Sequence, residues 1–139
     1  YRQQAYELDL HLDFQLDGEM ALPWYYDFDR MEQVLTNLVD NASRYTQPGD
    51  TIAIHAKSTI DQQILIVKDT GVGIPSEHLE KVFERFYKVD AARKRGKQGT
   101  GLGLFITRMI IEAHGGHIDV DSRINEGTTF TITLPKKKA

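Results

Sequence analysis

The stretch Gln98-Gly99-Thr100-Gly101-Leu102-Gly103-Leu104 alternates glycine with other residues and leads directly into a helical pattern. Apolar residues recur there at three- and four-residue spacing, so one face of this helix is expected to lie in the core. They are Leu102, Phe105, Ile106, Met109, Ile110 and Ala113. Gly115-Gly116 should end the helix. A glycine-rich turn before a helix presents free backbone N–H groups and the positive end of the helix dipole, which suit a phosphate. This stretch alone fits an ordinary flexible loop slightly better, and the rest of the chain reverses that preference.

Two common phosphate-binding motifs do not fit this stretch. A dinucleotide fingerprint needs a third glycine at Leu104 or Ile106 and a strand before the loop, whereas residues 93–97 are polar. A P-loop needs Gly-Lys followed by Ser or Thr, which the chain lacks. A phosphate cradle here must therefore be of another type.

The composition is that of one soluble globular domain. The 139 residues are 40% hydrophobic and 27% charged, enough for a single core. The net charge of −3 is too small to indicate nucleic-acid binding, and the absence of cysteine excludes disulfides, zinc–thiolate sites and thiol catalysis. No run is long and apolar enough to span a bilayer. Because the chain begins without Met, we expect it to be a piece of a longer protein.

The first part of the chain predicts two strands and a helix. Residues 1–8 are interpreted as the end of a preceding segment. Residues 8–16 alternate leucine or phenylalanine with polar residues, which indicates a half-buried strand, and residues 22–26 form a short second strand. A helix capped by an aspartate then runs to about Arg44. Its apolar stripe comprises Met31, Val34, Leu35, Leu38, Val39 and Ala42.

Polar residues gather on another face of that helix. Asn37, Asn41, Arg44 and Tyr45 fall at positions i, i+4, i+7 and i+8. Asparagine is a mediocre helix former, so two asparagines on one face need a reason. They are either two surface amides or parts of one polar site.

A buried carboxylate is predicted at the end of a central strand. Residues 51–59 alternate as a strand, and the apolar run 64–67 is typical of a strand buried on both faces. This run leads to Asp69 and the tight loop 70–75. The alternative interpretation is a turn-forming aspartate, because Asp followed by Thr-Gly is good turn chemistry.

The second part of the chain completes the predicted fold. Ser76 is expected to cap a short helix through Lys81, and an apolar cluster follows it: Val82, Phe83, Phe86 and Tyr87. Residues 88–98 hold five lysines and arginines against one aspartate, which predicts a mobile basic loop. Two further strands, marked by Ile118, Val120, Phe130, Ile132 and Leu134, flank the turn Asn125-Glu126-Gly127. We expect an α+β two-layer sandwich, with a mixed sheet of about five strands packed under three helices.

Four blocks of the sequence together resemble a known family. They are Asn37-Leu-Val-Asp-Asn41-Ala-Ser-Arg44-Tyr45-Thr46, Asp69-Thr-Gly71-Val-Gly73-Ile-Pro75, Phe83-Glu-Arg85-Phe86-Tyr87 and Gly99-Thr-Gly101-Leu-Gly103-Leu104. Their order and spacing closely resemble the N, G1, F and G2 boxes of bacterial sensor histidine kinases, over residues 30–134. The resemblance implies the Bergerat-type ATP-binding sandwich, shared with gyrase-type topoisomerases, mismatch-repair clamps and a large heat-shock chaperone.

The resemblance implies an adenine site around Asp69. This carboxylate would accept a hydrogen bond from the exocyclic amine of adenine, where guanine presents a carbonyl instead. Gly71 and Gly73 would let the backbone approach the base, with Ile74 next to them in the same loop. Asn41 would supply a neutral oxygen to Mg²⁺, which keeps waters and takes other ligands from the phosphates.

The resemblance also implies phosphate contacts. Asn37 is similar to the second N-box residue of the family. Arg44 would balance phosphate charge, and Tyr45 would pack against the adenine or ribose. Arg85 would contact the γ-phosphate, its alternative being a surface ion pair with a neighbouring carboxylate. Backbone N–H groups of Thr100, Gly101, Leu102, Gly103 and Leu104 would hold the phosphates.

Three regions complete the implied domain organisation. The basic loop 88–98 resembles the family's ATP lid, and residues 135–139 form a solvated tail. All of residues 1–139 would form one catalytic ATP-binding domain on the cytoplasmic side of an integral plasma-membrane sensor. The domain itself would contact neither membrane nor nucleic acid.

The phosphoacceptor is missing from this chain. Kinases of this family phosphorylate a histidine in a separate helical segment, typically Ser-His-Glu-Leu-Arg-Thr-Pro, and no such motif occurs here. The five histidines lie on predicted strands or helix ends and are interpreted as structural or solvated. The implied partners are therefore the dimerisation and phosphoacceptor domain of the parent kinase and, downstream, a response regulator.

Two other functions compete with a kinase domain. In ATP-gated clamps of the gyrase, mismatch-repair and chaperone type, a glutamate at the position of Asn37 activates the attacking water. An asparagine cannot act as that base, so hydrolysis should be poor. The second alternative is a module that senses nucleotide but has lost transfer chemistry, and nothing in the intact boxes supports that loss.

Overall fold

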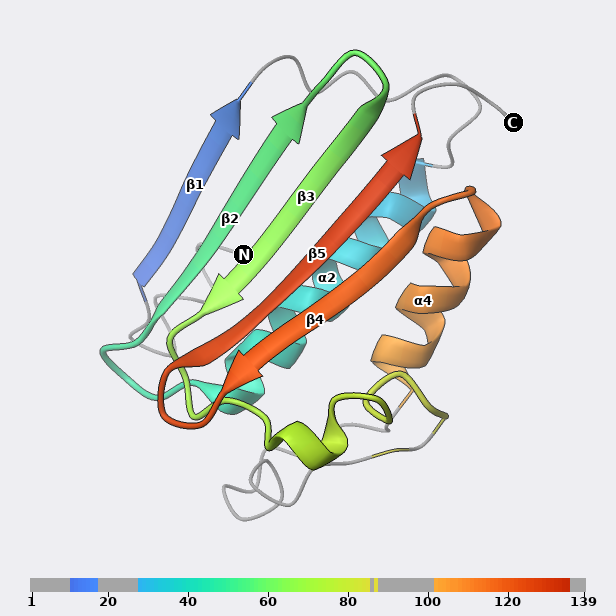
Figure 1. Cartoon of the computed structure of the whole chain (residues 1–139). Coiled ribbons are helices and arrows are strands. Elements are labelled where there is room, and N and C mark those ends of the chain that lie inside the picture. The colour runs from blue at the N-terminus through green and yellow to red at the C-terminus, as the bar shows by residue number, and fades with distance from the viewer. Residues whose placement is uncertain (1–10, 18–27, 86, 88–101, 136–139) are drawn as a thin grey trace.

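The computed structural model describes residues 11–17, 28–85, 87 and 102–135 (Figure 1). Its elements are β1 (His11–Asp17), α2 (Phe28–Tyr45), β2 (Thr51–Ser58), β3 (Gln62–Asp69), the 3-10 helix η1 (Ser76–His78), α4 (Gly103–Ala113), β4 (His117–Arg123) and β5 (Gly127–Pro135). Several predictions fall outside the described residues: the strand at 22–26, the basic loop at 88–98, Thr100 and Gly101, and most of the tail.

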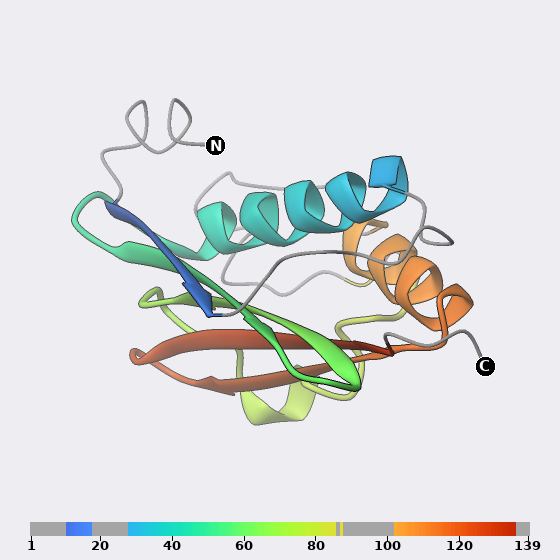
Figure 2. The same ribbon diagram turned by 90° about the horizontal axis from the view of Figure 1, so that it is seen from above.

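One five-stranded sheet forms the base of the molecule. Its strand order is β1-β2-β3-β5-β4, with β1 parallel to β2 and every other neighbouring pair antiparallel. Both α-helices cover the same face of this sheet, so the fold has two layers (Figure 2). The predicted mixed sheet is confirmed. In the described part of the chain, two α-helices and the short η1 take the place of three helices.

The core lies between the sheet and the helices. Alternate residues of β2 and β5 are buried there: Ile52, Ile54, Ala56, Phe130, Ile132 and Leu134. The buried part of the α2 stripe meets them, with Val34, Leu38, Val39 and Ala42. Phe83 packs edge-on against Phe130, with ring centroids 6.1 Å apart. The period of two in the strands and the helical period in α2 therefore place these residues as predicted.

The central strand β3 is not buried on both faces, contrary to expectation. Val67 points into the core and is 1% exposed, whereas Ile64 and Ile66 are half-buried and lie on the opposite face. The strand is central because β2 and β5 pair with its two edges. The two α-helices cover only one of its faces.

The core face of α4 also differs from the prediction. Its buried residues are Thr107, Ile110 and Ile111, whereas Met109 is 55% exposed and Ala113 is exposed. The apolar arc of this helix is wide enough to fit two neighbouring faces, and packing against α2 selects one of them.

The predicted helix from Ser76 to Lys81 is wrong in length and in its cap. Only Ser76–His78 form a 3-10 helix, and Pro75 stands at the N-cap position without a side-chain hydrogen bond. A 3-10 helix of one turn is a common connector where the chain cannot continue a regular helix.

The predicted C-terminal end of α4 is confirmed. His114 is the C-cap of this helix, and Gly115, which follows it, has φ +81°.

Candidate functional site

Asp69 is the last residue of β3 and lies near Tyr45 at the end of α2. Its side chain is 2% exposed, and its Oδ1 accepts a hydrogen bond from the Gly71 N–H at 2.9 Å. Burial raises the pKa of Asp69 to about 6, and hydrogen bonds from the backbone of Gly71 and Thr128 partly offset that rise. Asp69 is therefore mostly ionised at neutral pH and has unused acceptor capacity in a buried place.

The loop after Asp69 is held between α2 and the β4–β5 hairpin. The Val72 N–H donates to the Tyr45 carbonyl oxygen at 3.0 Å, and the Asn125 N–H donates to the Val72 carbonyl oxygen at 2.8 Å. At Gly73, which has φ +77°, a Cβ would lie 2.2 Å from the carbonyl oxygen of Arg123. At Gly71 a Cβ would likewise lie 2.1 Å from the carbonyl oxygen of Tyr45, so at both glycines the loop approaches other backbone too closely for a side chain.

Two predicted site residues of α2 are buried one turn apart. Asn41 and Tyr45 are each 6% exposed, and burial raises the pKa of the Tyr45 phenol to about 12. The Asn41 Nδ2 is buried and makes no hydrogen bond within the described structure. A buried amide with one unsatisfied end is costly, and such groups are usually satisfied by something bound.

Asn37 connects α2 to the beginning of α4. Its Nδ2 donates to the Gly103 carbonyl oxygen at 3.3 Å and to the Thr107 Oγ1 at 3.2 Å. The N-cap of α4 is Leu102, and no side chain caps this helix end. The first N–H groups of a helix have no partner within the helix, so this end offers donors. Asn37 fixes the position of those donors.

The arginines of the site differ in placement. Arg44 lies half-buried in the last turn of α2. Arg85 is exposed, and its guanidinium lies over the Phe105 ring at 5.5 Å from the centroid. This contact brings the F-box segment against the first turn of α4.

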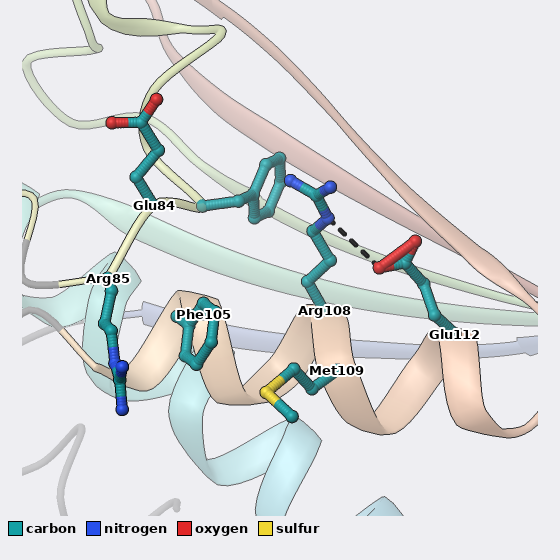
Figure 3. Close-up of a pocket in the computed structure, with 7 residues that line it drawn as sticks. Glu84, Arg85, Phe105, Arg108, Met109 and Glu112 are labelled. Carbon is teal, nitrogen blue, oxygen red and sulfur yellow. Dashed lines mark hydrogen bonds and ion pairs between the residues drawn. The ribbon is translucent and has the colours of Figure 1, made fainter.

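A pocket opens where the F-box segment meets α4. It has a volume of about 310 Å³ and is lined by Phe83, Glu84, Arg85, Phe105, Arg108, Met109 and Glu112. Figure 3 shows the side chains of α4 projecting into it, with Arg108 and Glu112 paired at 3.2 Å. We refer to it as the α4 pocket. It lies on the face of α4 that the sequence assigned to the core.

The structure thus brings most of the predicted residues into two neighbouring groups. The first comprises Asn41, Tyr45, Asp69, Gly71, Gly73 and Ile74, and the second comprises Asn37, Arg85, Leu102, Gly103 and Leu104. Sequence reasoning missed Ser122 and Thr128, which lie opposite each other on β4 and β5. The available signal was their position: each continues the inward-facing alternation of an apolar strand.

The chain is similar to known proteins over almost its whole length. Residues 26–138 match the family model described as histidine kinase-, DNA gyrase B-, and HSP90-like ATPase. The sensor protein SrrB of Staphylococcus aureus (strain NCTC 8325 / PS 47) is 63% identical over 136 residues, which cover 98% of this chain and 23% of SrrB. The chain therefore spans about a quarter of the length of the curated relatives it matches.

Solved structures agree in fold. The catalytic domain of histidine kinase ThkA has a TM-score of 0.82 and 33% identity, covering 97% of this chain and 86% of that domain. ThkA has also been solved in complex with the response regulator protein TrrA, with a TM-score of 0.78, 30% identity and coverage of 98% of this chain and 37% of ThkA. Full-length ShkA in complex with AMPPNP has a TM-score of 0.81 and 26% identity, covering 99% of this chain and 28% of ShkA. The chain belongs to the histidine kinase-, DNA gyrase B- and HSP90-like ATPase family, and it is the catalytic ATP-binding domain of a sensor histidine kinase.

Proposed function

We propose that this domain binds Mg·ATP with its adenine on Asp69 and donates the γ-phosphate to a histidine on a separate dimerisation and phosphoacceptor domain. The observation that carries the proposal is the 2% exposed carboxylate of Asp69 beside a loop with two close backbone approaches. We further propose that the two-layer sandwich is of the Bergerat type.

Adenine selectivity follows from the acceptor character of Asp69. An amino group brings a donor to the carboxylate, whereas the carbonyl of guanine would bring a second acceptor and leave both groups unsatisfied. Since burial prevents water from replacing the missing donor, the difference is large.

Few side chains in the described part of the chain suit a metal ion. Within the described ranges, no three His, Asp or Glu side chains are grouped so that they could hold a metal ion. The amide oxygen of Asn41 would be one ligand, whereas its buried Nδ2, which has no partner within the described structure, is a donor and would face a phosphate oxygen. Mg²⁺, when bound, neutralises phosphate charge and would take its remaining ligands from phosphates and water.

The phosphates are proposed to lie at the beginning of α4. Residues 100–104 would supply backbone N–H groups, and Arg44 and Arg85 would supply positive charge. Residues 88–98, proposed as the ATP lid, lie outside the described residues, and their assignment depends on sequence alone.

Asn37 argues against the ATP-gated clamp. Its amide nitrogen donates to Gly103 and Thr107, and an amide cannot take a proton from water at neutral pH. The phosphoryl group is therefore proposed to leave only for an acceptor supplied by another domain.

The α4 pocket is proposed to receive that acceptor domain. It presents the apolar surfaces of Phe105 and Met109 next to Arg85, which we place at the γ-phosphate. We also propose that the parent protein is an integral plasma-membrane sensor with this domain on its cytoplasmic side, and that it signals to a response regulator. Neither α-helix in the described part of the chain is long and apolar enough to cross a bilayer.

Radiolabelled ATP tests the proposal directly. The chain should not label itself, and it should label an added phosphoacceptor domain of the parent kinase with an acid-labile, base-stable phosphate. Asp69→Asn should abolish most of this transfer, whereas the exposed Asp61→Asn should leave it unchanged. Strong labelling of the isolated chain on one of its own histidines would contradict the proposal.

A further inference from the structure

Four side chains form a row across four strands beneath the loop at residues 70–75, which we call the adenine loop after the binding proposed above. Ile52 on β2 pairs with Asp69 on β3, Asp69 pairs with Thr128 on β5, and Thr128 pairs with Ser122 on β4. Paired residues of neighbouring antiparallel strands point to the same face of the sheet. Ser122 therefore stands two strands away from Asp69 in the same row, and no box of the family resemblance includes it.

The Ser122 hydroxyl makes three hydrogen bonds. Its Oγ accepts from the Ile74 N–H at 2.7 Å, donates to the Gly127 carbonyl oxygen at 2.9 Å and lies 2.8 Å from the Thr128 Oγ1. The first bond fixes the backbone of the adenine loop at Ile74, whose side chain is 1% exposed. The second fixes the start of β5, where a Cβ on Gly127 would lie 1.9 Å from the Asp69 carbonyl oxygen.

Hydrogen counting determines the direction of the third bond. A serine hydroxyl has one hydrogen and two lone pairs. Because the Ser122 hydrogen goes to Gly127 and one lone pair goes to Ile74, the Thr128 hydroxyl must donate to the remaining lone pair. Thr128 then offers only lone pairs elsewhere, so it is an acceptor in the position paired with Asp69.

We propose that Ser122 is a positioning residue of the adenine site, which fixes the adenine loop at Ile74 and keeps the Thr128 hydroxyl an acceptor beside Asp69. It thereby contributes to the preference for an amino purine over a keto purine. This inference depends on the proposed binding of adenine at Asp69.

Loss of the hydroxyl has two effects in this arrangement. In Ser122→Ala the buried Ile74 N–H and the Thr128 hydroxyl both lose their partner. The loop is then no longer held at Ile74 and has to be ordered when the nucleotide binds, and Thr128 can present a hydrogen instead of a lone pair in the position paired with Asp69. Both effects act on the amino purine, so the affinity for ATP should fall about tenfold, the size expected for one lost buried hydrogen bond, while the affinity for GTP changes little.

Calorimetric titration of the 139-residue chain with ATP and GTP tests the proposal. Ser122→Ala should lower the ratio of ATP to GTP affinity about tenfold, and Ser122→Thr, which keeps the hydroxyl, should restore it. Two controls separate positioning from loss of stability. Ser76→Ala makes the same change at an exposed serine, and Val120→Ala trims a half-buried side chain on the same strand. Both should keep the wild-type ratio, even where the melting temperature falls.

The outcomes distinguish this proposal from the proposed function. Equal affinity of the wild-type chain for ATP and GTP would overturn the adenine site on Asp69 and this proposal with it. A selective wild type with an unchanged ratio in Ser122→Ala would overturn only the role of Ser122. If Ser122→Ala does not fold, the isosteric Thr128→Val should lower the ratio, and an unchanged ratio there would overturn the proposal.

Discussion

Gly71 lies directly against the last residue of α2: a Cβ on Gly71 would be 2.1 Å from the carbonyl oxygen of Tyr45. The next residue, Val72, donates its N–H to that same oxygen at 3.0 Å. The adenine loop is therefore in direct backbone contact with the helix that carries Asn41. A change in the loop is transmitted to α2 without any side chain between them.

Gly71→Ala should displace the loop and weaken ATP binding. A methyl group cannot fit against the Tyr45 carbonyl, and overpacking of this kind costs about 1–3 kcal/mol of stability. We expect a loss of ATP affinity of at least roughly tenfold by calorimetry. Gly49→Ala is the control, because no atom lies within 4 Å of a Cβ at Gly49, so the same substitution there meets no backbone, although its φ is positive at +95°. That variant should lose some stability and keep its ATP affinity.

Asp69→Asn should stabilise the ligand-free fold and lose most of its ATP binding. Because burial raises the pKa of Asp69 to about 6, the ionised carboxylate destabilises the ligand-free fold at neutral pH. The amide keeps an oxygen for the Gly71 N–H and carries no charge, so the variant should be more stable in urea by on the order of 1–3 kcal/mol at pH 7. ATP binding should be largely lost. A variant that is less stable and still binds ATP would contradict both expectations.

The same raised pKa gives the ligand-free chain a pH dependence of definite sign. The folded state binds a proton at Asp69 more tightly than the unfolded state, whose carboxyl titrates near 3.8. The contribution of Asp69 to stability is therefore largest below about pH 4 and is lost as the pH rises through about 6. Stability measured in urea between these values should fall less steeply with rising pH in Asp69→Asn than in the wild type.

Adenine selectivity should have the opposite pH dependence. Protonation of Asp69 removes the acceptor for the adenine amine, so the ratio of ATP to GTP affinity should decrease as the pH falls through about 6. Using the ratio cancels the titration of the phosphates, which the two nucleotides share. A constant ratio between pH 5 and 8, roughly the range over which this carboxyl titrates, would show that Asp69 does not read the base.

Asn41→Ala tests the metal ligand. The variant should lose more affinity for Mg·ATP than for ADP in the presence of a chelator, because only the first ligand set includes the metal. It should also gain slightly in stability or remain neutral, since it removes a buried amide end that has no partner. Equal losses of affinity for both nucleotides would indicate that Asn41 only shapes the pocket.

Met109→Asp tests the α4 pocket as the docking site of the acceptor domain. Met109 is 55% exposed, so a charge there should have little effect on folding or on ATP affinity. Phosphoryl transfer to the acceptor domain should fall, mainly through a higher concentration of acceptor needed for half-maximal rate. Ile60→Asp is the matched control, because Ile60 is 87% exposed in the β2–β3 connection, away from the pocket. Equal transfer by both variants would place the docking site elsewhere.

Elements whose pattern is set by one buried face are predictable from the sequence alone. The alternation of Ile52 and Ile54, and of Phe130, Ile132 and Leu134, predicts β2 and β5, and the apolar stripe of α2 predicts its core face. The position of Asp69 is also predictable, because a carboxylate directly after an apolar run and before two glycines is unusual on local grounds. These features depend on the repeat of side-chain directions along strands and helices and on the residue preferences of turns, which act over a few residues.

The local sequence does not settle which of two apolar faces of α4 is buried, nor that the helices cover β3 on one face alone; the packed fold shows both. Both results depend on which element packs where, and the local pattern of α4 is the same for either face. The role of Ser122 is of this kind as well. Its hydroxyl contacts Ile74, 48 residues earlier in the chain, and the bond exists only because the sheet order places β4 next to β5 and the hairpin tip against the loop after β3. Long-range pairing of strands brings such groups together, and no local preference of the chain records it.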